Sequence, residues 1–123
     1  MTWKDIGKDH LQAAKQALER HPRSAASRAY YAAHVVLAEE LIAAGCVLGS
    51  RRETPPHNAQ AQLIGMHLAG RGASFVRELR SVVRRLYSRR LDADYKRTVT
   101  LDRALALDSV RDASTLFSLF DVM

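Results

Sequence analysis

Apolar residues recur every three or four positions along most of the chain, and this spacing limits the fold more than any other feature. Trp3, Ile6, His10 and Ala14 begin the pattern, which places their side chains on one face of a helix. No segment of useful length alternates apolar and polar residues as a half-buried strand does. No internal repeat or long linker divides the 123 residues. We therefore predict a single domain over residues 1–123, an all-α, up-and-down bundle.

Proline and glycine residues set the predicted helix limits. The first helix, over residues 3–20, ends before Pro22, because proline disfavours the α conformation in the residue before it. Ser24 is expected to cap the second helix, and Gly45 to end it. An exposed loop is predicted over residues 45–57. A short helix over 58–69 and two further main helices over 73–90 and 102–120 follow, with a connection over 91–100.

Cysteine content and hydropathy predict the compartment. The single cysteine, Cys46, excludes an intramolecular disulfide framework and suits a reducing environment. The N-terminus lacks the apolar segment of a secretory signal. The longest mostly apolar run, over residues 29–38, is interrupted by His34 and is far shorter than a membrane span. We expect a soluble, cytoplasmic protein with no membrane partner.

The net charge of +6 lies in one stretch, residues 71–90, which holds seven arginines and one acid, Glu78. Basic and acidic residues balance in the rest of the chain. Such a concentration favours a phosphate-bearing or acidic partner. The alternative is a solvated basic helix with no ligand. The arginines are Arg71, Arg77, Arg80, Arg84, Arg85, Arg89 and Arg90.

A helical wheel divides these arginines into two kinds. Arg77, Arg80 and Arg84 form one ridge, opposite the apolar residues, and the ridge is expected to face solvent or phosphate. Arg90 instead continues the apolar side of the helix. A buried guanidinium there needs an acidic or hydrogen-bonding partner. Alternatively, Arg90 lies past the last helical turn and points to water.

Two segments resemble known family signatures. Residues 27–34 read Ser-Arg-Ala-Tyr-Tyr-Ala-Ala-His, and residues 90–95 read Arg-Leu-Asp-Ala-Asp-Tyr. Both resemble motifs of the HEPN family, and they occur in that family's order. The resemblance implies a helical bundle that dimerises. It also implies a toxin–antitoxin-like role, since small HEPN proteins are often encoded beside a minimal nucleotidyltransferase.

Many HEPN proteins are metal-independent endoribonucleases that use an arginine and a histidine separated by four to six residues. In this chain that count from Arg89 or Arg90 reaches Asp94, Tyr95, Lys96 and Arg97, and no histidine follows His67. Tyrosine, with a pKa of about 10, and aspartate, with about 3.9, are poor substitutes for histidine, with about 6.5. The candidate catalytic set implied by the resemblance is Arg90, Tyr95 and Asp94.

Two other pairs satisfy the bare arginine–histidine spacing. Arg28 and His34 lie about 120° apart on a helix and do not share a face, so His34 is interpreted as a core or interface residue. Arg52 and His57 lie in the proline-containing loop, within reach of a ligand. Arg28 and Tyr31 line a cleft with the residues of the second signature or close a dimer interface.

Three functions remain open from the sequence. The first is a HEPN module that homodimerises, binds a nucleotidyltransferase antitoxin and binds RNA or nucleotide. The second is an endoribonuclease toxin. The third is a helical scaffold for an acidic protein. No metal-binding or glycine-rich phosphate motif occurs, so no metal or cofactor is expected. The predicted RNA- or nucleotide-binding residues are Arg28, Tyr31, Arg77, Arg80, Arg84 and Arg89.

Overall fold

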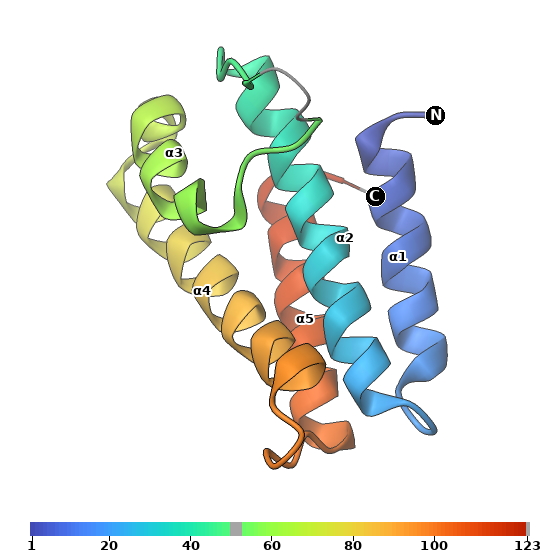
Figure 1. Ribbon diagram of the computed structural model, residues 1–123. Helices are drawn as coiled ribbons and strands as arrows, with labels where there is room; N and C mark the ends of the chain where they lie inside the picture. Colours follow the sequence, from blue (N-terminus) through green and yellow to red (C-terminus); the bar gives the residue numbers. More distant parts are fainter. Residues whose placement is uncertain (50–52, 123) are drawn as a thin grey trace.

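The described residues, 1–49 and 53–122 of a computed structural model, form an all-α bundle of four long helices and one short one. Long helices that follow one another in the sequence run in opposite directions (Figure 1). This confirms the predicted fold class. No helix among the described residues combines the length and apolar character needed to cross a membrane. The elements are α1 (Trp3–Ala17), α2 (Pro22–Ala43), the 3-10 turn η1 (His57–Ala59), α3 (Gln60–His67), the 3-10 turn η2 (Ala69–Arg71), α4 (Ala73–Tyr95) and α5 (Arg103–Leu119).

Helix α2 is the centre of the bundle and contacts α1, α4 and α5. Helices α1 and α2 approach each other closely at Gly7 of α1, which has no side chain. A Cβ atom there would lie 2.8 Å from Val36 Cγ2 and 3.0 Å from the Ala32 carbonyl oxygen of α2. Larger side chains from all five helices, Leu11 of α1 among them, fill the remaining space. The fully buried ones include Tyr30, Leu37, Leu41, Ile64, Leu79, Leu86 and Leu116.

The predicted start of the second helix was wrong. Helix α2 begins at Pro22, so Ser24 lies inside the first turn and is not its cap. Proline suits the first helical position, since its fixed φ is helical and the missing N–H has no partner there. Helix α1 likewise ends at Ala17, three residues before the predicted limit.

The predicted end of the second helix, α2, at Gly45 is confirmed. Gly45 has φ +102° and directly follows the C-cap, Ala44. The Cys46 N–H donates to the Leu41 carbonyl at 2.9 Å, and the Gly45 N–H donates to the Ile42 carbonyl at 3.0 Å. This is a Schellman motif, which favours glycine because the backbone turns left-handed.

Helix α4 runs to Tyr95, five residues beyond its predicted end. The predicted connection over residues 91–100 is therefore wrong in its first half. Arg90 lies within the helix, and the second signature forms its last turns. The α5 helix starts after Asp102, whose Oδ1 accepts a hydrogen bond from the Leu105 N–H at 3.0 Å.

Candidate functional site

Arg90 of α4 is the centre of a site built by both signature segments. Only 9 % of its surface is exposed. Its Nη2 donates to the Tyr31 hydroxyl of α2 at 2.7 Å and lies 3.5 Å from the Tyr95 hydroxyl. The prediction that Arg90 lies on the inner side of the helix and needs a partner is confirmed. The alternative, in which it extends into water beyond the helix, is wrong.

Three tyrosine rings enclose the Arg90 guanidinium. Its Cζ lies 5.4 Å from the ring centre of Tyr31, 5.2 Å from that of Tyr95 and 5.9 Å from that of Tyr30. Aromatic faces attract a cation, and more strongly where water is excluded. The rings therefore hold a charged group where the helical pattern calls for an apolar one.

The Arg90 Nε atom keeps an unused hydrogen-bonding capacity. It lies 3.0 Å from Asp94 Oδ2, within ion-pair distance, yet its N–H is not directed at the oxygen, and this buried atom has no hydrogen-bond partner. A buried donor without a partner costs about 1–3 kcal/mol.

Asp94 joins the end of α4 to the start of the first signature. Its Oδ2 accepts a hydrogen bond from Ser27 Oγ at 3.2 Å. A surface hollow of about 300 Å³ lies beside it, lined by residues of α2 and α4 that include Arg28. Arg28 is exposed, and its Nη1 lies 3.3 Å from His10 Nδ1. Arg28 thus borders the site through this hollow, while Tyr31 and Tyr95 touch Arg90 directly.

Two histidines lie behind the tyrosines. The His34 and His57 rings stack with their centres 4.3 Å apart. The Gln60 side chain donates to the Tyr30 hydroxyl at 2.9 Å and lies 3.0 Å, through its Oε1, from His34 Nδ1. The Tyr30 hydroxyl is 2.5 Å from His57 Nδ1. His34 is buried, as predicted for a core histidine, while the suggested partner of His57, Arg52, lies outside the described residues.

Burial, together with smaller effects of His34 and Arg90, lowers the pKa of His57 to about 4. Burial likewise lowers the pKa of His34 and raises that of Tyr30. All three groups are therefore neutral at pH 7. Because the Tyr30 hydroxyl already accepts from Gln60, its proton is available to a neutral His57 Nδ1.

These shifts predict a pH-dependent stability. An unfolded histidine has a pKa of about 6.5, so between pH 6.5 and about 4 the unfolded chain binds more protons at His57 than the folded chain does. Stability is therefore lost as the pH falls through this window. Thermal unfolding at pH 7.5 and 4.5 measures the loss. The loss should be smaller in His57→Gln, and unchanged in the control His21→Gln, whose side chain is exposed. An equal loss in all three proteins would contradict the assignment.

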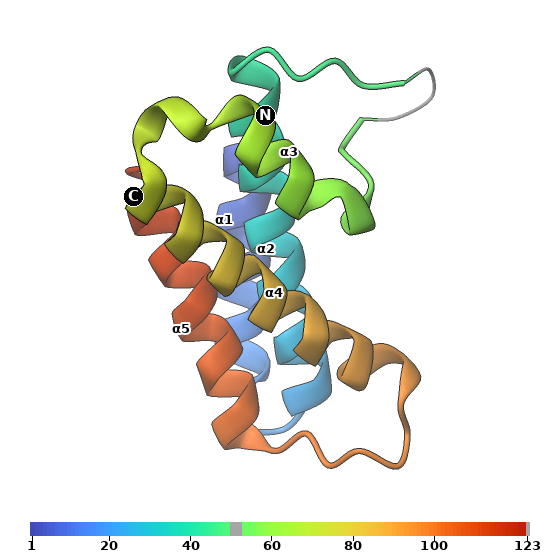
Figure 2. The same cartoon turned by 90° about the vertical axis from the view of Figure 1, so that its left-hand side faces the viewer.

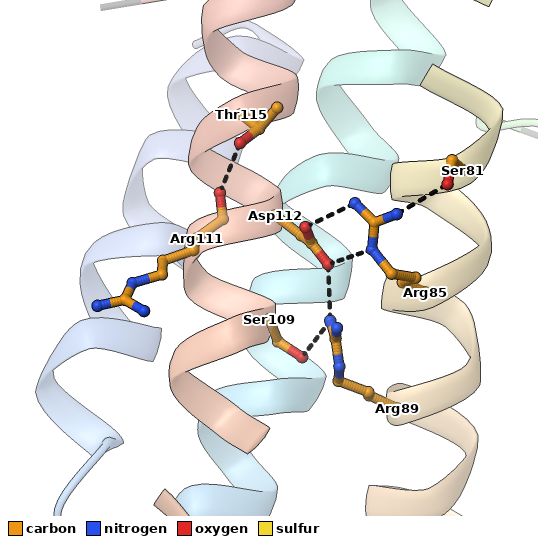
Figure 3. Close-up of polar contacts among 7 residues, drawn as sticks. All are labelled: Ser81, Arg85, Arg89, Ser109, Arg111, Asp112 and Thr115. Carbon is orange, nitrogen blue, oxygen red and sulfur yellow. Dashed lines mark hydrogen bonds and ion pairs between the residues drawn. The ribbon is translucent and has the colours of Figure 1, made fainter. Parts of the chain in front are cut away.

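Arg85 and Arg89 are held by one carboxylate of α5 (Figure 3). Arg85 donates from Nε and Nη2 to the two Asp112 oxygens at 3.1 and 3.0 Å. Arg89 Nη1 donates to Asp112 Oδ2 at 2.8 Å. Burial would raise the pKa of Asp112, but hydrogen bonds from both arginines lower it below its usual value. Arg89 is part of an ion-pair cluster that joins α4 to α5, and its binding of RNA remains a prediction.

Arg77, Arg80 and Arg84 are exposed on α4, as the helical wheel predicted. The structure brings none of them to Arg90. Arg80 Nε donates to the Ala61 carbonyl of α3 at 2.9 Å. Phosphate binding by these three residues remains a prediction.

Sequence reasoning missed Arg23, which holds the end of α4. Its Nη1 donates to the carbonyls of Asp92 and Ala93 at 2.9 and 3.1 Å. Its Nη2 donates to the carbonyls of Lys96 and Val99 in the connection that follows. The last carbonyls of a helix lack partners within it. Arg23 of α2 supplies a hydrogen-bond donor to these carbonyls of α4, and no local sequence signal marks such a long-range contact.

Among the described residues, no group of three or more histidine, cysteine or acidic side chains is arranged to hold a metal ion. Comparison of the chain with protein-family models, with curated proteins and with solved structures finds no match.

Proposed function

We propose that this protein is a HEPN-like module that binds a phosphate group of a nucleotide or RNA at the Arg90 site. One observation carries the proposal: the Arg90 guanidinium donates to the Tyr31 hydroxyl at 2.7 Å, across 59 residues of sequence. The two segments that resemble family signatures thus meet at one buried side chain. A chance match of two short motifs gives no reason for that contact.

The chemistry of the site suits an anion. Arginine presents a planar fork of donors that matches phosphate oxygens, and burial strengthens each such hydrogen bond. Around Arg90, the tyrosine hydroxyls are further potential donors. Asp94 opposes an anion directly, because its Oδ2 lies 3.0 Å from Arg90 Nε, although it also pairs with Ser27. The site therefore selects a ligand that brings both phosphate and hydrogen-bonding groups, as a nucleotide does.

Titration with a 5′-phosphorylated RNA dinucleotide at low salt tests the proposal by calorimetry. A saturable exchange of heat with a stoichiometry of one per chain is expected. Absence of binding by the wild-type protein, or binding that Arg90→Lys leaves unchanged, would refute it.

The resemblance also motivates a protein partner. We propose a homodimer that binds a nucleotidyltransferase antitoxin. The test is copurification with any nucleotidyltransferase that is encoded beside this chain, with light scattering to count the copies. A chain that runs alone at 13.7 kDa and retains no partner would overturn this part of the proposal and leave the Arg90 site standing.

An endoribonuclease is the second candidate, favoured by the position of His57. Cleavage by proton transfer needs an arginine for phosphate charge and a group that exchanges protons. The second signature lacks the histidine, but η1 brings the His57 ring to 6.0 Å from that of Tyr31, which binds Arg90. RNA cleavage by the purified protein should be lost in both Arg90→Ala and His57→Ala. Cleavage that persists in either variant would exclude this pair.

A further inference from the structure

One face of α4 carries hydrogen-bond donors and no carboxylate. Serines and arginines alternate along it, within about 120° of one another on the helical wheel. Glu78, at its edge, is the only acid between Ala73 and Leu91. Figure 2 shows α4 on the outer side of the bundle, with no helix in front of it. We define this α4 donor face as Ser74, Arg77, Arg80, Ser81, Arg84 and Ser88.

Ion pairing separates this face from the other arginines of the bundle. Arg71 pairs with Glu40, and Arg85 and Arg89 pair with Asp112. Within the described part of the chain, Arg77 and Arg84 have no carboxylate within ion-pair distance. The positive charge of the donor face is therefore not neutralised by the protein itself.

Surface hollows follow the same face. One of about 490 Å³ is lined by all three arginines of the face together with Ser81. Another of about 290 Å³ continues past Arg84 to Ser88. Gly65 of α3 contributes to this shape, since a Cβ atom there would collide with the Arg80 guanidinium. The absence of a side chain at Gly65 thus lets Arg80 lie across α3.

The composition of the face distinguishes among partners. Protein interfaces depend on buried aromatic or aliphatic anchors, and no large apolar side chain is exposed between Ala73 and Arg89 of α4. A second copy of the same face would be repelled by like charge. Phosphodiester oxygens, by contrast, accept from both arginine and serine donors.

We propose that the α4 donor face binds the sugar–phosphate backbone of a single-stranded nucleic acid. At 1.5 Å per residue, Arg77 and Arg84 are about 10 Å apart along the helix. Arg90 lies on the opposite side of α4, so the donor face binds a strand independently of the Arg90 site.

Salt dependence of oligonucleotide binding tests the inference. The probes are labelled RNA and DNA strands of about 12 nucleotides, within the range that such surfaces bind. Each phosphate neutralised on a single strand contributes about 0.7 to the slope of log K against log salt. The variant Arg77→Gln/Arg84→Gln/Arg80→Gln should lower that slope by about 2. Between 50 and 200 mM salt, the wild type should thus lose about 20-fold more affinity than the variant.

A matched variant controls for net charge. Lys8→Gln/Lys15→Gln/Arg111→Gln removes the same charge from exposed positions on α1 and α5. The Arg111 side chain points away from α4 (Figure 3). For this control variant, the slope of log K against log salt should stay within about 0.5 of the wild-type value. An equal fall in both triple variants, or none in the donor-face variant, would overturn the inference.

The double variant Arg77→Gln/Arg84→Gln, which keeps the Arg80 contact to α3, should lower the slope by about 1.4.

Two further arms identify the ligand. Equal affinity for RNA and DNA would assign binding to the phosphodiester backbone, and preference for RNA would add a contact to the 2′-hydroxyl. Polyglutamate and unlabelled oligonucleotide are each used to displace the labelled oligonucleotide. If polyglutamate does so at a lower concentration of negative charges, the inference is overturned in favour of an acidic protein. The dinucleotide should bind the donor-face variant as it binds the wild type. The dinucleotide titration therefore tests the Arg90 site alone, and the salt dependence of oligonucleotide binding tests the donor face alone.

Discussion

Replacing Arg90 with lysine is expected to weaken binding of the 5′-phosphorylated dinucleotide at least tenfold, or by about 1.4 kcal/mol or more. Lysine keeps the positive charge but not the planar fork of donors. It cannot contact the Tyr31 hydroxyl and also present a second nitrogen to phosphate in the same plane. Calorimetric titration of the two proteins at equal low salt measures the difference.

The control for this substitution is Arg89→Lys, one residue earlier on the same helix. Arg89 is held by Asp112 of α5, so its replacement should change the dinucleotide affinity less than twofold. Circular dichroism shows whether each variant keeps its helices. A folded Arg90→Lys protein with wild-type affinity, or an equal loss in Arg89→Lys, would contradict the assignment of the site.

Replacing Arg23 with methionine is expected to lower the free energy of unfolding by about 2 kcal/mol. Hydrogen bonds that involve a charged group contribute about 1.5–3 kcal/mol. Arg23 donates to the carbonyls of Ala93 in the last turn of α4 and of Val99 in the connection to α5. Methionine retains much of the apolar stem, so the loss reports mainly on the guanidinium. Urea unfolding at pH 7 measures it.

Arg20→Met is the matched control, because Arg20 is exposed in the nearby turn between α1 and α2. A surface change of this kind should stay within about 0.5 kcal/mol of the wild type. Arg23→Met should also weaken dinucleotide binding, since fraying of α4 displaces Asp94 and Tyr95 from Arg90. Equal stability of the two variants would show that the α4 end does not depend on Arg23.

Local patterns in the sequence predicted most of the fold. Apolar spacing located all the helices, because each one buries a stripe of side chains. Arg90 was placed on the inner side of α4 by the same spacing. Gly45 was correctly identified as the end of α2, since a left-handed residue after a helix is a local requirement.

Long-range contacts account for what could not be predicted. Helix α4 extends to Tyr95 because Arg23, far away in sequence, binds its last carbonyls. Arg89 faces Asp112 because of the packing of α4 on α5, which no local spacing encodes. The position of His57 beside Tyr30 likewise depends on a contact between η1 and α2, which are distant in sequence.

The most direct test of the Arg90 site is nitrogen-resolved NMR of the arginine side chains during titration with the dinucleotide. Arg90 Nε is buried and has no hydrogen-bond partner, whereas Arg85 Nε already donates to Asp112 at 3.1 Å. If a phosphate binds the guanidinium as proposed, the Arg90 side-chain N–H signals shift with saturation, and the Arg85 signals stay in place. An Arg90 signal that remains fixed while the dinucleotide binds would contradict the proposed site.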